Sequence, residues 1–583
     1  MKLLLLILAV TAVSAVLRPP GYWKKRLFEK ERKGSQLNEQ YPWLQTLWFD
    51  QKMDHFDQYN TGTWKQKYYL NPKYDRGNGI IFLMIGGEGP ESGHWAADPD
   101  VQYLQWAAEY GALVFDLEHR FFGDSWPVPN MNTTSLRLLT STQALADIAY
   151  FIQSMNQLHG FNNPRWVTFG GSYPGALAAW FREKYPEYTV GSVASSGVVN
   201  LKLDFYEYAM GVNDDLWVTQ PDCATATKAA FQAIQNLTMT EAGRDKLSNQ
   251  LQLVPPFDNS TSKLDITNLF GNLYNVYQGM SQYTYDGQSV KTETVLTDAA
   301  VCNIMTNTSI PDPVDRVYEL MMWYDEIYGD NSGQFPNSYW DAINPVSTGN
   351  LTALGEDNAA ARGWMWLCCN ELGFMQTTDQ GDNVFGSTIP LNFFIDMCTD
   401  MFGSDITMDH VYNTNWNAQK YYGGAEKYYA TNIVLPNGSM DPWHLLGTYF
   451  NNSTLGATSI LINGTAHCSD MYPSYPGEPA VLAPARAIIK GQVQTFIRSP
   501  VCCLFLCHSL LTVSLYNPLR IKGSIRVEVT PSRPLLLCPA LLSLPSPLGL
   551  VPELYEVGSH NLLPRLPQQS GRFWIRLSGD RPL

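Results

Sequence analysis

The stretch TFGGSYPGALAAWF (Thr168–Phe181) places one serine between glycines, at the point where an apolar strand-like run changes into a helix-like one. Ser172 follows Gly170 and Gly171, and Pro174 stands in the first turn of the expected helix, where the N–H groups have no partner within the helix. A sharp turn of this kind lifts a serine hydroxyl above the edge of a sheet. Ser172 is therefore a candidate nucleophile, and a purely structural turn is the alternative.

The motif departs from the pattern G-x-S-x-G in one respect, because the second glycine falls one position late, at Gly175. Two later residues supply the partners that a serine nucleophile needs. Asp441 follows the strand-like run 431–435, and His467 follows the run 459–462. A base must take the hydroxyl proton, and a carboxylate must orient that base. Ser172, Asp441 and His467 are therefore our predicted catalytic residues.

Four other histidines are weaker candidates for the base. His444 stands three residues from Asp441 with no strand between them, so we expect it to pack near that loop. His119 precedes the serine, which is the wrong chain order for the base. His94 and His410 have no comparable placement, and we expect them to be ordinary surface or core histidines.

An acyl-transfer site also needs donors that stabilise the developing oxyanion. We expect one donor at the backbone N–H of Tyr173 and another in the loop IGGEGPESG, at Gly87 or Glu88. The Glu88 carboxylate could hold the free amino end of a peptide, or it could merely shape the loop. The glycines of this loop match no nucleotide-binding motif, and the chain has no zinc motif such as HExxH, so no cofactor or metal is expected.

The surrounding sequence indicates an α/β fold. Between strand-like runs lies 141–158, in which apolar residues recur at helical spacing. Strands that alternate with helices of this length favour a mostly parallel sheet. The expected strands are 80–85, 112–117, 166–169, 192–194, 431–435 and 459–462, and 483–497 is expected as a closing helix.

The composition changes twice along the chain. From about residue 200, strand-like runs thin out and helical stretches such as 317–328 occur, so we expect a mainly helical insertion within the sheet domain. The predicted division is 45–200 and 410–498 for the two parts of the core and 201–409 for the insertion. The segment 499–583 shifts to Leu, Pro and Ser without sustained periodicity and is predicted to be a disordered or aberrant tail. A membrane anchor there is the less favoured alternative.

The beginning of the chain indicates the secretory pathway. MKLLLLILAVTAVSA (1–15) has the layout of a signal peptide. Glycosylation patterns occur at Asn132, Asn236, Asn259, Asn307, Asn350, Asn452 and Asn463. In an oxidising compartment the cysteines up to residue 500 are candidates for disulfides, although spacing alone does not give their pairing. A formal net charge of -15 argues against nucleic acid or an anionic membrane surface as the main partner.

A series of motifs resembles the serine peptidase family of lysosomal Pro-Xaa carboxypeptidase, dipeptidyl peptidase II and thymus-specific serine protease, and looks closest to the last of these. The motifs run in family order over about residues 45–498, and they are WFDQKMDHFD, TWKQKYYLN, GGEGP, LEHRFFGDS, FGGSYPGALAAW, NGSMDPW and GTAHCSDMYP. The resemblance implies an α/β-hydrolase domain capped by a helical insertion. It also implies a secreted or lysosomal exopeptidase that cleaves peptides beside proline or a small residue.

The resemblance further implies the disulfides Cys223–Cys302 and Cys369–Cys398 in the insertion. Cys368 and Cys468 would be left over, and Cys468 adjoins the predicted base. An esterase or lipase of the same fold and a non-catalytic binding protein are the other classes, although an intact set of three catalytic residues argues against the second. Whether the chain forms a homodimer stays open.

Overall fold

The structure, a computed structural model, describes residues 40–284, 301–328 and 333–498. The expected signal peptide (1–15) and tail (499–583) lie outside the described residues. All of the described residues belong to one structural unit.

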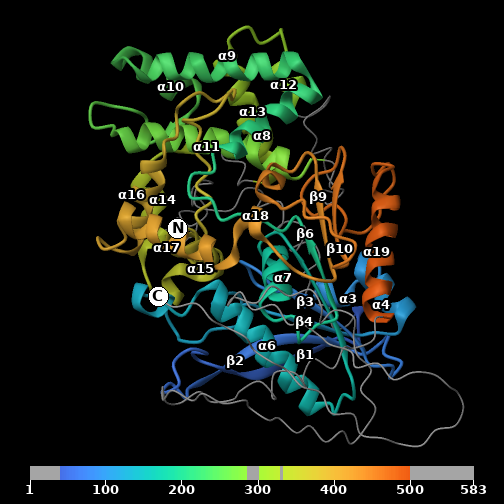
Figure 1. Cartoon of the computed structure of the whole chain (residues 1–583). Helices are drawn as coiled ribbons and strands as arrows, with labels where there is room; N and C mark the ends of the chain where they lie inside the picture. The colour runs from blue at the N-terminus through green and yellow to red at the C-terminus, as the bar shows by residue number, and fades with distance from the viewer. Residues whose placement is uncertain (1–39, 285–300, 329–332, 499–583) are drawn as a thin grey trace, which may run out of the picture. The chain divides into compact units, whose positions relative to one another are not determined.

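The centre of the fold is an eight-stranded sheet with the order β1-β2-β4-β3-β5-β6-β9-β10 (Figure 1). The first two strands pair antiparallel, and β2 pairs antiparallel with β4, whereas the remaining neighbours are parallel. The strands are β1 (Gln45–Lys52), β2 (Thr63–Asn71), β3 (Ile80–Ile85), β4 (Leu113–Leu117), β5 (Arg165–Gly171), β6 (Gly191–Ser195), β9 (Ile433–Gly438) and β10 (Ala457–Ile462). This largely parallel sheet, with the serine turn after β5, is that of an α/β-hydrolase.

Helices cover both faces of this sheet, and β3 is therefore buried along its whole length. Ile81 and Leu83 belong to an apolar cluster that contains residues of α6 and α7, whereas Phe82 and Met84 belong to a second cluster with residues of α4 and α19. These four helices are labelled in Figure 1. Because successive side chains of a strand point to opposite faces, a strand buried on both sides reads as one continuous apolar run. The core helices are α3 (His94–Ala97), α4 (Gln102–Tyr110), α5 (Thr133–Leu136), α6 (Ser141–Leu158), α7 (Tyr173–Lys184) and α19 (Leu482–Arg498).

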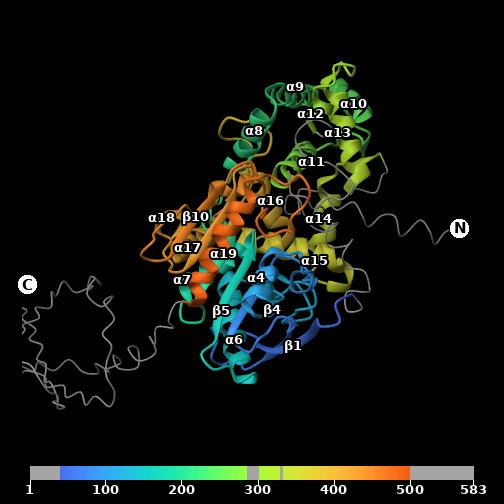
Figure 2. The ribbon, with the colours of Figure 1, turned by 90° about the vertical axis from the view of Figure 1, so that its right-hand side faces the viewer.

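The chain between β6 and β9 is mainly helical. Its helices are α8 (Glu207–Thr219), α9 (Pro221–Thr238), α10 (Glu241–Gln250), α11 (Lys263–Gln282), α12 (Val301–Met305), α13 (Pro313–Tyr328), α14 (Tyr339–Ser347), α15 (Leu351–Leu367), α16 (Leu391–Phe402), α17 (Met408–Tyr422) and α18 (Gly424–Lys427). Two-residue strands, β7 (Leu253–Val254) and β8 (Phe335–Pro336), also pair within it. In Figure 2, α9, α10, α12 and α13 group together at a distance from the sheet, whereas α15 lies close to it. The exact limits 201–409 of the insertion stay a prediction.

The sequence predicted the buried strands of this fold but not its first hairpin. The expected runs coincide with β3, β4, β5, β6, β9 and β10 apart from a few residues at their ends, and α6 matches its predicted range. The sequence analysis did not predict β1 and β2. Within 40–284, 301–328 and 333–498, no helix has the length and apolar content needed to cross a membrane.

Candidate active site

Ser172 stands in the sharp turn that joins β5 to α7. Its backbone has a φ of 67° and a ψ of -131°, a conformation that costs a residue with a side chain on the order of 1–3 kcal/mol. Two hydrogen bonds hold the turn: Ser172 N–H donates to the carbonyl of Ser195 at 3.0 Å, and Ala176 N–H donates to the carbonyl of Ser172 at 2.9 Å. The strained turn of a nucleophile elbow is therefore present at this serine.

Asp441 and His467 meet although 26 residues separate them in the sequence. Asp441 follows β9 and His467 follows β10, and Asp441 Oδ2 lies 2.7 Å from His467 Nδ1. Because an ionised carboxylate can only accept, the proton of this hydrogen bond sits on Nδ1. In the neutral ring Nε2 is then left as an acceptor, and among the described residues it has no hydrogen-bond partner. This is the tautomer that a general base requires.

The electrostatic surroundings of His467 favour its protonated form. Burial is the largest single effect and lowers the pKa of His467, but Asp441 and Cys468 beside the ring together outweigh burial and raise that pKa well above its usual value. The ring is almost completely buried, and its backbone N–H donates to the carbonyl of Gln282 at 2.9 Å. The end of α11 in the insertion therefore helps to fix the candidate base.

The loop of His467 lies directly against the turn of Ser172. Gly171 precedes the serine, and a Cβ atom placed on it would lie 2.9 Å from Cys468 Sγ and 2.4 Å from Met471 Sδ. Only glycine fits at this position, because any side chain would displace the histidine loop. The structure thus brings the immediate neighbours of Ser172 and His467 into contact.

The loop after β3 closes on the first turn of α7. A Cβ atom on Gly87 would lie 2.5 Å from Pro174 Cγ, so the backbone at Gly87 lies close to the start of that helix. Glu118 anchors this loop. Its Oε1 accepts from the backbone N–H of Glu91 at 3.0 Å and from Lys67 Nζ at 2.7 Å. This arrangement brings the two predicted donor segments, at Tyr173 and at Gly87, to the same end of α7.

Glu88 is half-buried beside the serine turn. Burial raises the pKa of the Tyr173 hydroxyl and of the Cys368 thiol, and the negative charge of Glu88 adds to both shifts. The carboxylate is therefore close enough to influence groups on α7 and in the insertion.

His119 contacts the site, which the sequence analysis did not foresee. Its Nδ1 lies 2.8 Å from the carbonyl of Arg120 and must donate, so Nε2 accepts from the Tyr173 hydroxyl at 3.2 Å. Burial lowers the pKa of His119 to about 4, so the ring stays neutral at neutral pH. His119 thus orients the side chain of the residue that follows Ser172. The only signal in the sequence was its position after β4.

The other histidines have the ordinary surroundings that we expected. His444 Nδ1 lies 2.7 Å from the Tyr449 hydroxyl, and burial lowers the pKa of His444. His94 lies 3.2 Å from Asp98, and His410 lies 3.2 Å from the side-chain oxygen of Asn370. None of these contacts involves the serine turn.

Disulfides join Cys223 to Cys302 and Cys369 to Cys398, which is the pairing that the resemblance implied. The first links α9 to α12, and the second links the turn after α15 to α16. Cys368 and Cys468 are buried and carry free thiols. In the part of the chain that the structure describes, no group of three His, Cys, Asp or Glu side chains could hold a metal ion.

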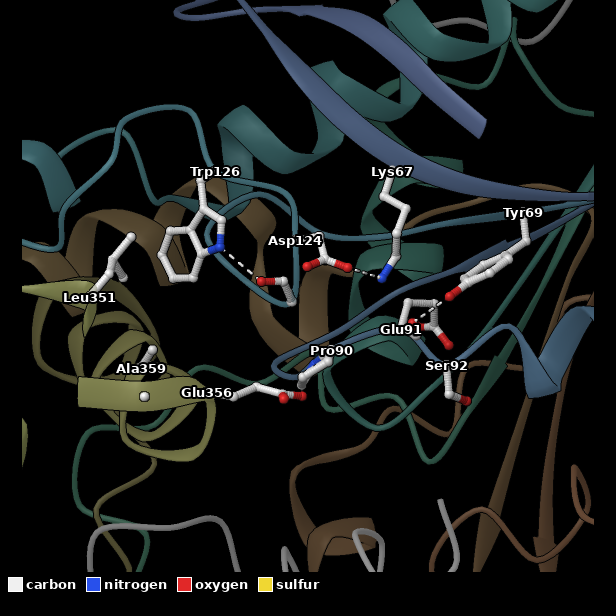
Figure 3. A pocket seen from close by; sticks show the side chains of 12 residues that line it. Lys67, Tyr69, Pro90, Glu91, Ser92, Asp124, Trp126, Leu351, Glu356 and Ala359 are labelled. Atoms are coloured by element: carbon white, nitrogen blue, oxygen red, sulfur yellow. Dashed lines mark hydrogen bonds and ion pairs between the residues drawn. The ribbon is translucent and has the colours of Figure 1, made fainter. Parts of the chain in front are cut away.

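A cavity of about 510 Å³ lies between α15 and the loops after β3 and β4 (Figure 3). Figure 3 shows Lys67 pointing toward Asp124 on one wall, and Glu356 of α15 on the other. In the sheet order, β2 stands three strand spacings from β5, so Lys67 lies roughly 14 Å from the serine strand. None of the three predicted catalytic residues lines this cavity.

Comparisons with known proteins show the family to which the chain belongs. A Caenorhabditis elegans protein named as a serine protease is 62% identical over 467 residues, which cover 80% of this chain and 86% of the relative. The human thymus-specific serine protease is 30% identical over 470 residues, which cover 77% and 86%. The human lysosomal Pro-X carboxypeptidase is 27% identical over 464 residues, which cover 78% and 88%.

Among solved structures, a proline iminopeptidase from Mycobacterium smegmatis aligns with a TM-score of 0.33 and 12% identity, covering 77% of this chain and 98% of that chain. The family model described as serine carboxypeptidase S28 matches residues 51–489, a segment that contains the serine turn and the loops after β9 and β10. The chain therefore belongs to the serine carboxypeptidase S28 family and is a serine-type peptidase.

Proposed function

We propose that this peptidase is an exopeptidase that works through an acyl-enzyme formed on Ser172. The observation that carries the proposal is the contact of 2.7 Å between His467 Nδ1 and Asp441 Oδ2, beside a strained serine turn. Nucleophile, base and carboxylate each follow a strand of one sheet, in the chain order that this fold uses.

In the proposed mechanism, Ser172 Oγ attacks the carbonyl carbon of the scissile peptide bond while His467 Nε2 takes the hydroxyl proton. Asp441 keeps the imidazole in the required tautomer and stabilises its cation. The backbone N–H groups of Tyr173 and Gly87 donate to the oxyanion of the tetrahedral intermediate. His467 then returns the proton to the leaving amine, and water repeats the sequence to release the acyl group.

A row of aromatic rings supports a preference for proline or a small residue at the cut. Tyr173 lies 6.1 Å from Trp364, Trp364 lies 6.5 Å from Phe374, and Phe374 lies 5.3 Å from Trp443, between ring centroids. The row runs from the residue after Ser172 to the second residue after Asp441. Flat apolar rings of this kind bind a compact apolar side chain. A Pro-X carboxypeptidase among the relatives is consistent with such a preference.

The same proposal includes a secretory location. The predicted signal peptide directs the chain there, and two disulfides within the insertion suit an oxidising compartment. The asparagines at six of the seven sequons are exposed, and Asn452 is partly exposed. Secretion and delivery to lysosomes are both compatible with these features.

Mass spectrometry of the products tests the specificity. Proline-containing peptides blocked at one end or the other would be incubated with the purified protein and with Ser172→Ala. Loss of a dipeptide only from peptides with a free amino end would make the enzyme a dipeptidyl peptidase and Glu88 the first candidate for the amine site. Cleavage that needs a free carboxyl end would make it a Pro-Xaa-type carboxypeptidase. Cleavage of acyl esters without cleavage of peptides would contradict the peptidase proposal.

The variant Ser172→Ala also tests the nucleophile. We expect kcat to fall by on the order of 10⁶-fold, since the three catalytic groups act as a unit. Circular dichroism should be unchanged, because the hydroxyl contributes no bond that holds the turn. A purified variant with more than a few per cent of normal activity would rule out this role of Ser172.

A further inference from the structure

One serine at the end of β6 contacts both halves of the proposed catalytic machinery. The carbonyl of Ser195 accepts from the backbone N–H of Ser172 at 3.0 Å. The hydroxyl of the same residue donates to Asp470 Oδ2 at 2.6 Å. Asp470 stands three residues after His467, on the loop that carries the base. Ser195 is completely buried, and Asp470 is 5% exposed.

The next residue of the strand end strengthens this link. Ser196 Oγ accepts from the backbone N–H of Cys468 at 3.0 Å, directly beside His467. The two consecutive serines therefore hold the histidine loop at two points, one on each side of Ser469. A loop of this kind is a mobile element unless its backbone is tied down at several points.

An arginine fixes the same loop from the side of α19. Arg486 Nε donates to the carbonyl of Asp470 at 3.1 Å, and its Nη2 donates to the carbonyl of Ser469 at 2.9 Å. Arg486 is 5% exposed, and Glu478 Oε2 holds its Nη1 at 2.7 Å. The histidine loop is thus clamped between the end of β6 and the closing helix of the core.

We propose that Asp470 is a positioning residue, which acts through Ser195 to hold His467 at its working distance from Ser172. This inference rests on the proposed function, because it concerns the same nucleophile and base. A hydrogen bond to a carboxylate is roughly twice as strong as one between neutral groups. Displacing a catalytic group by about 1 Å can cost on the order of 10²-fold in rate.

The charged groups around Asp470 suit this role. Burial raises the pKa of Asp470 to about 6, while the hydrogen bond from Ser195 and the charges of Arg486 and His467 act in the opposite direction. The carboxyl is therefore mostly ionised at neutral pH. Its other neighbours in a small adjoining cavity are uncharged and include Tyr103 and Gln102 of α4 and Met471.

The test is a double-mutant cycle on the full chain with Asp470→Asn and Ser195→Ala. We expect each variant to lower kcat by about 10- to 100-fold and to leave KM within about twofold, because the loop is displaced while the binding groups are not. The rate at which a fluorophosphonate labels Ser172 should fall by the same factor as kcat. The double variant should lose little more than either single variant, as expected for two residues of one interaction.

Ser192→Ala is the matched control. Ser192 lies in the same strand and is equally buried, but its hydroxyl donates to the carbonyl of Ala178 at 3.0 Å and does not contact the histidine loop. We expect this variant to lose thermal stability and to keep its kcat.

The two proposals fail in different ways. Cleavage that persists in Ser172→Ala would overturn the proposed function itself. If cleavage depends on Ser172 but Asp470→Asn and Ser195→Ala keep the normal kcat and labelling rate, the positioning role is wrong. Additive losses in the double variant would also contradict it. If Asp470→Asn does not fold, Ser195→Ala removes only one hydroxyl. Its kcat and labelling rate then decide whether the positioning role is right.

Discussion

The environment of His467 determines the pH range of the proposed base. Only the neutral ring can take a proton, and the pKa of His467 is raised because Asp441 and Cys468 together outweigh the effect of burial. Protonation therefore begins at a higher pH than for an ordinary histidine, and activity is lost as pH falls through that pKa. We expect the acidic limb of kcat/KM to have its midpoint above about 6.5, the usual value for histidine. Rates measured from pH 4 to 9 check this.

The variant Asp441→Asn is the control for this prediction on the pH dependence. Without the carboxylate, the pKa of His467 should fall, and the acidic limb should move to lower pH. The rate should also decrease by about 10⁴-fold, as for the equivalent change in other serine proteases. An acidic limb that stays in place in this variant would mean that another group controls it.

At the scale of single residues, the catalytic candidates could be read from the sequence, but their supports could not. Ser172, Asp441 and His467 each follow an apolar run, so local pattern and chain order were sufficient to select them. The same rule of chain order excluded His119 as the base, because it precedes the serine. Its contact with the Tyr173 hydroxyl depends on how the loop after β4 packs against α7, and a linear pattern does not contain that information.

At the scale of elements, the loop after β3 is the part most sensitive to a single methyl group. In Gly87→Ala the new Cβ would meet Pro174, whereas at Gly89 a Cβ has open space around it. We expect Gly87→Ala to lower kcat/KM by on the order of 10²-fold, because the donor segment must move away from the serine turn. Gly89→Ala should behave as the normal enzyme. Equal effects of the two substitutions would contradict the close approach of Gly87 to α7.

The strands that we predicted from the sequence differ physically from the two that we did not predict. β3 is buried along its whole length and therefore reads as the apolar run IIFLMI. β1 is an edge strand whose residues are largely exposed, and β2 carries the buried Lys67, which pairs with Glu118 and Asp124. Neither strand has a continuous apolar run or a clean alternation, so neither matches the pattern of a buried strand.

At the scale of the whole molecule, the insertion contacts the segments that carry the candidate catalytic residues. The carbonyl of Gln282 accepts from His467 N–H, and Trp364 of α15 lies against Tyr173. The sequence predicted that residues between β6 and β9 form a helical insertion, because composition changes there. It could not predict which residues of the insertion contact the core, since these contacts join positions that are far apart in the chain.

The disulfides should stabilise this insertion unequally. Cys223–Cys302 closes a loop with a sequence separation of 79, which corresponds to about 4.5 kcal/mol by loop entropy. Cys369–Cys398 has a separation of 29 and corresponds to about 3.6 kcal/mol. We expect the double variant Cys223→Ser with Cys302→Ser to lose more of the free energy of unfolding than the double variant at the shorter loop. Urea unfolding compares them, and the reverse order would contradict this ranking.

Covalent trapping tests the central claim most directly. The protein would be treated with a fluorophosphonate, digested and analysed by mass spectrometry, alongside the variants His467→Ala and Ser192→Ala. We expect one adduct, on Ser172, that forms in the normal protein and in Ser192→Ala and is nearly absent in His467→Ala. An adduct on another residue, or cleavage of peptides by a protein that never forms an adduct on Ser172, would contradict it.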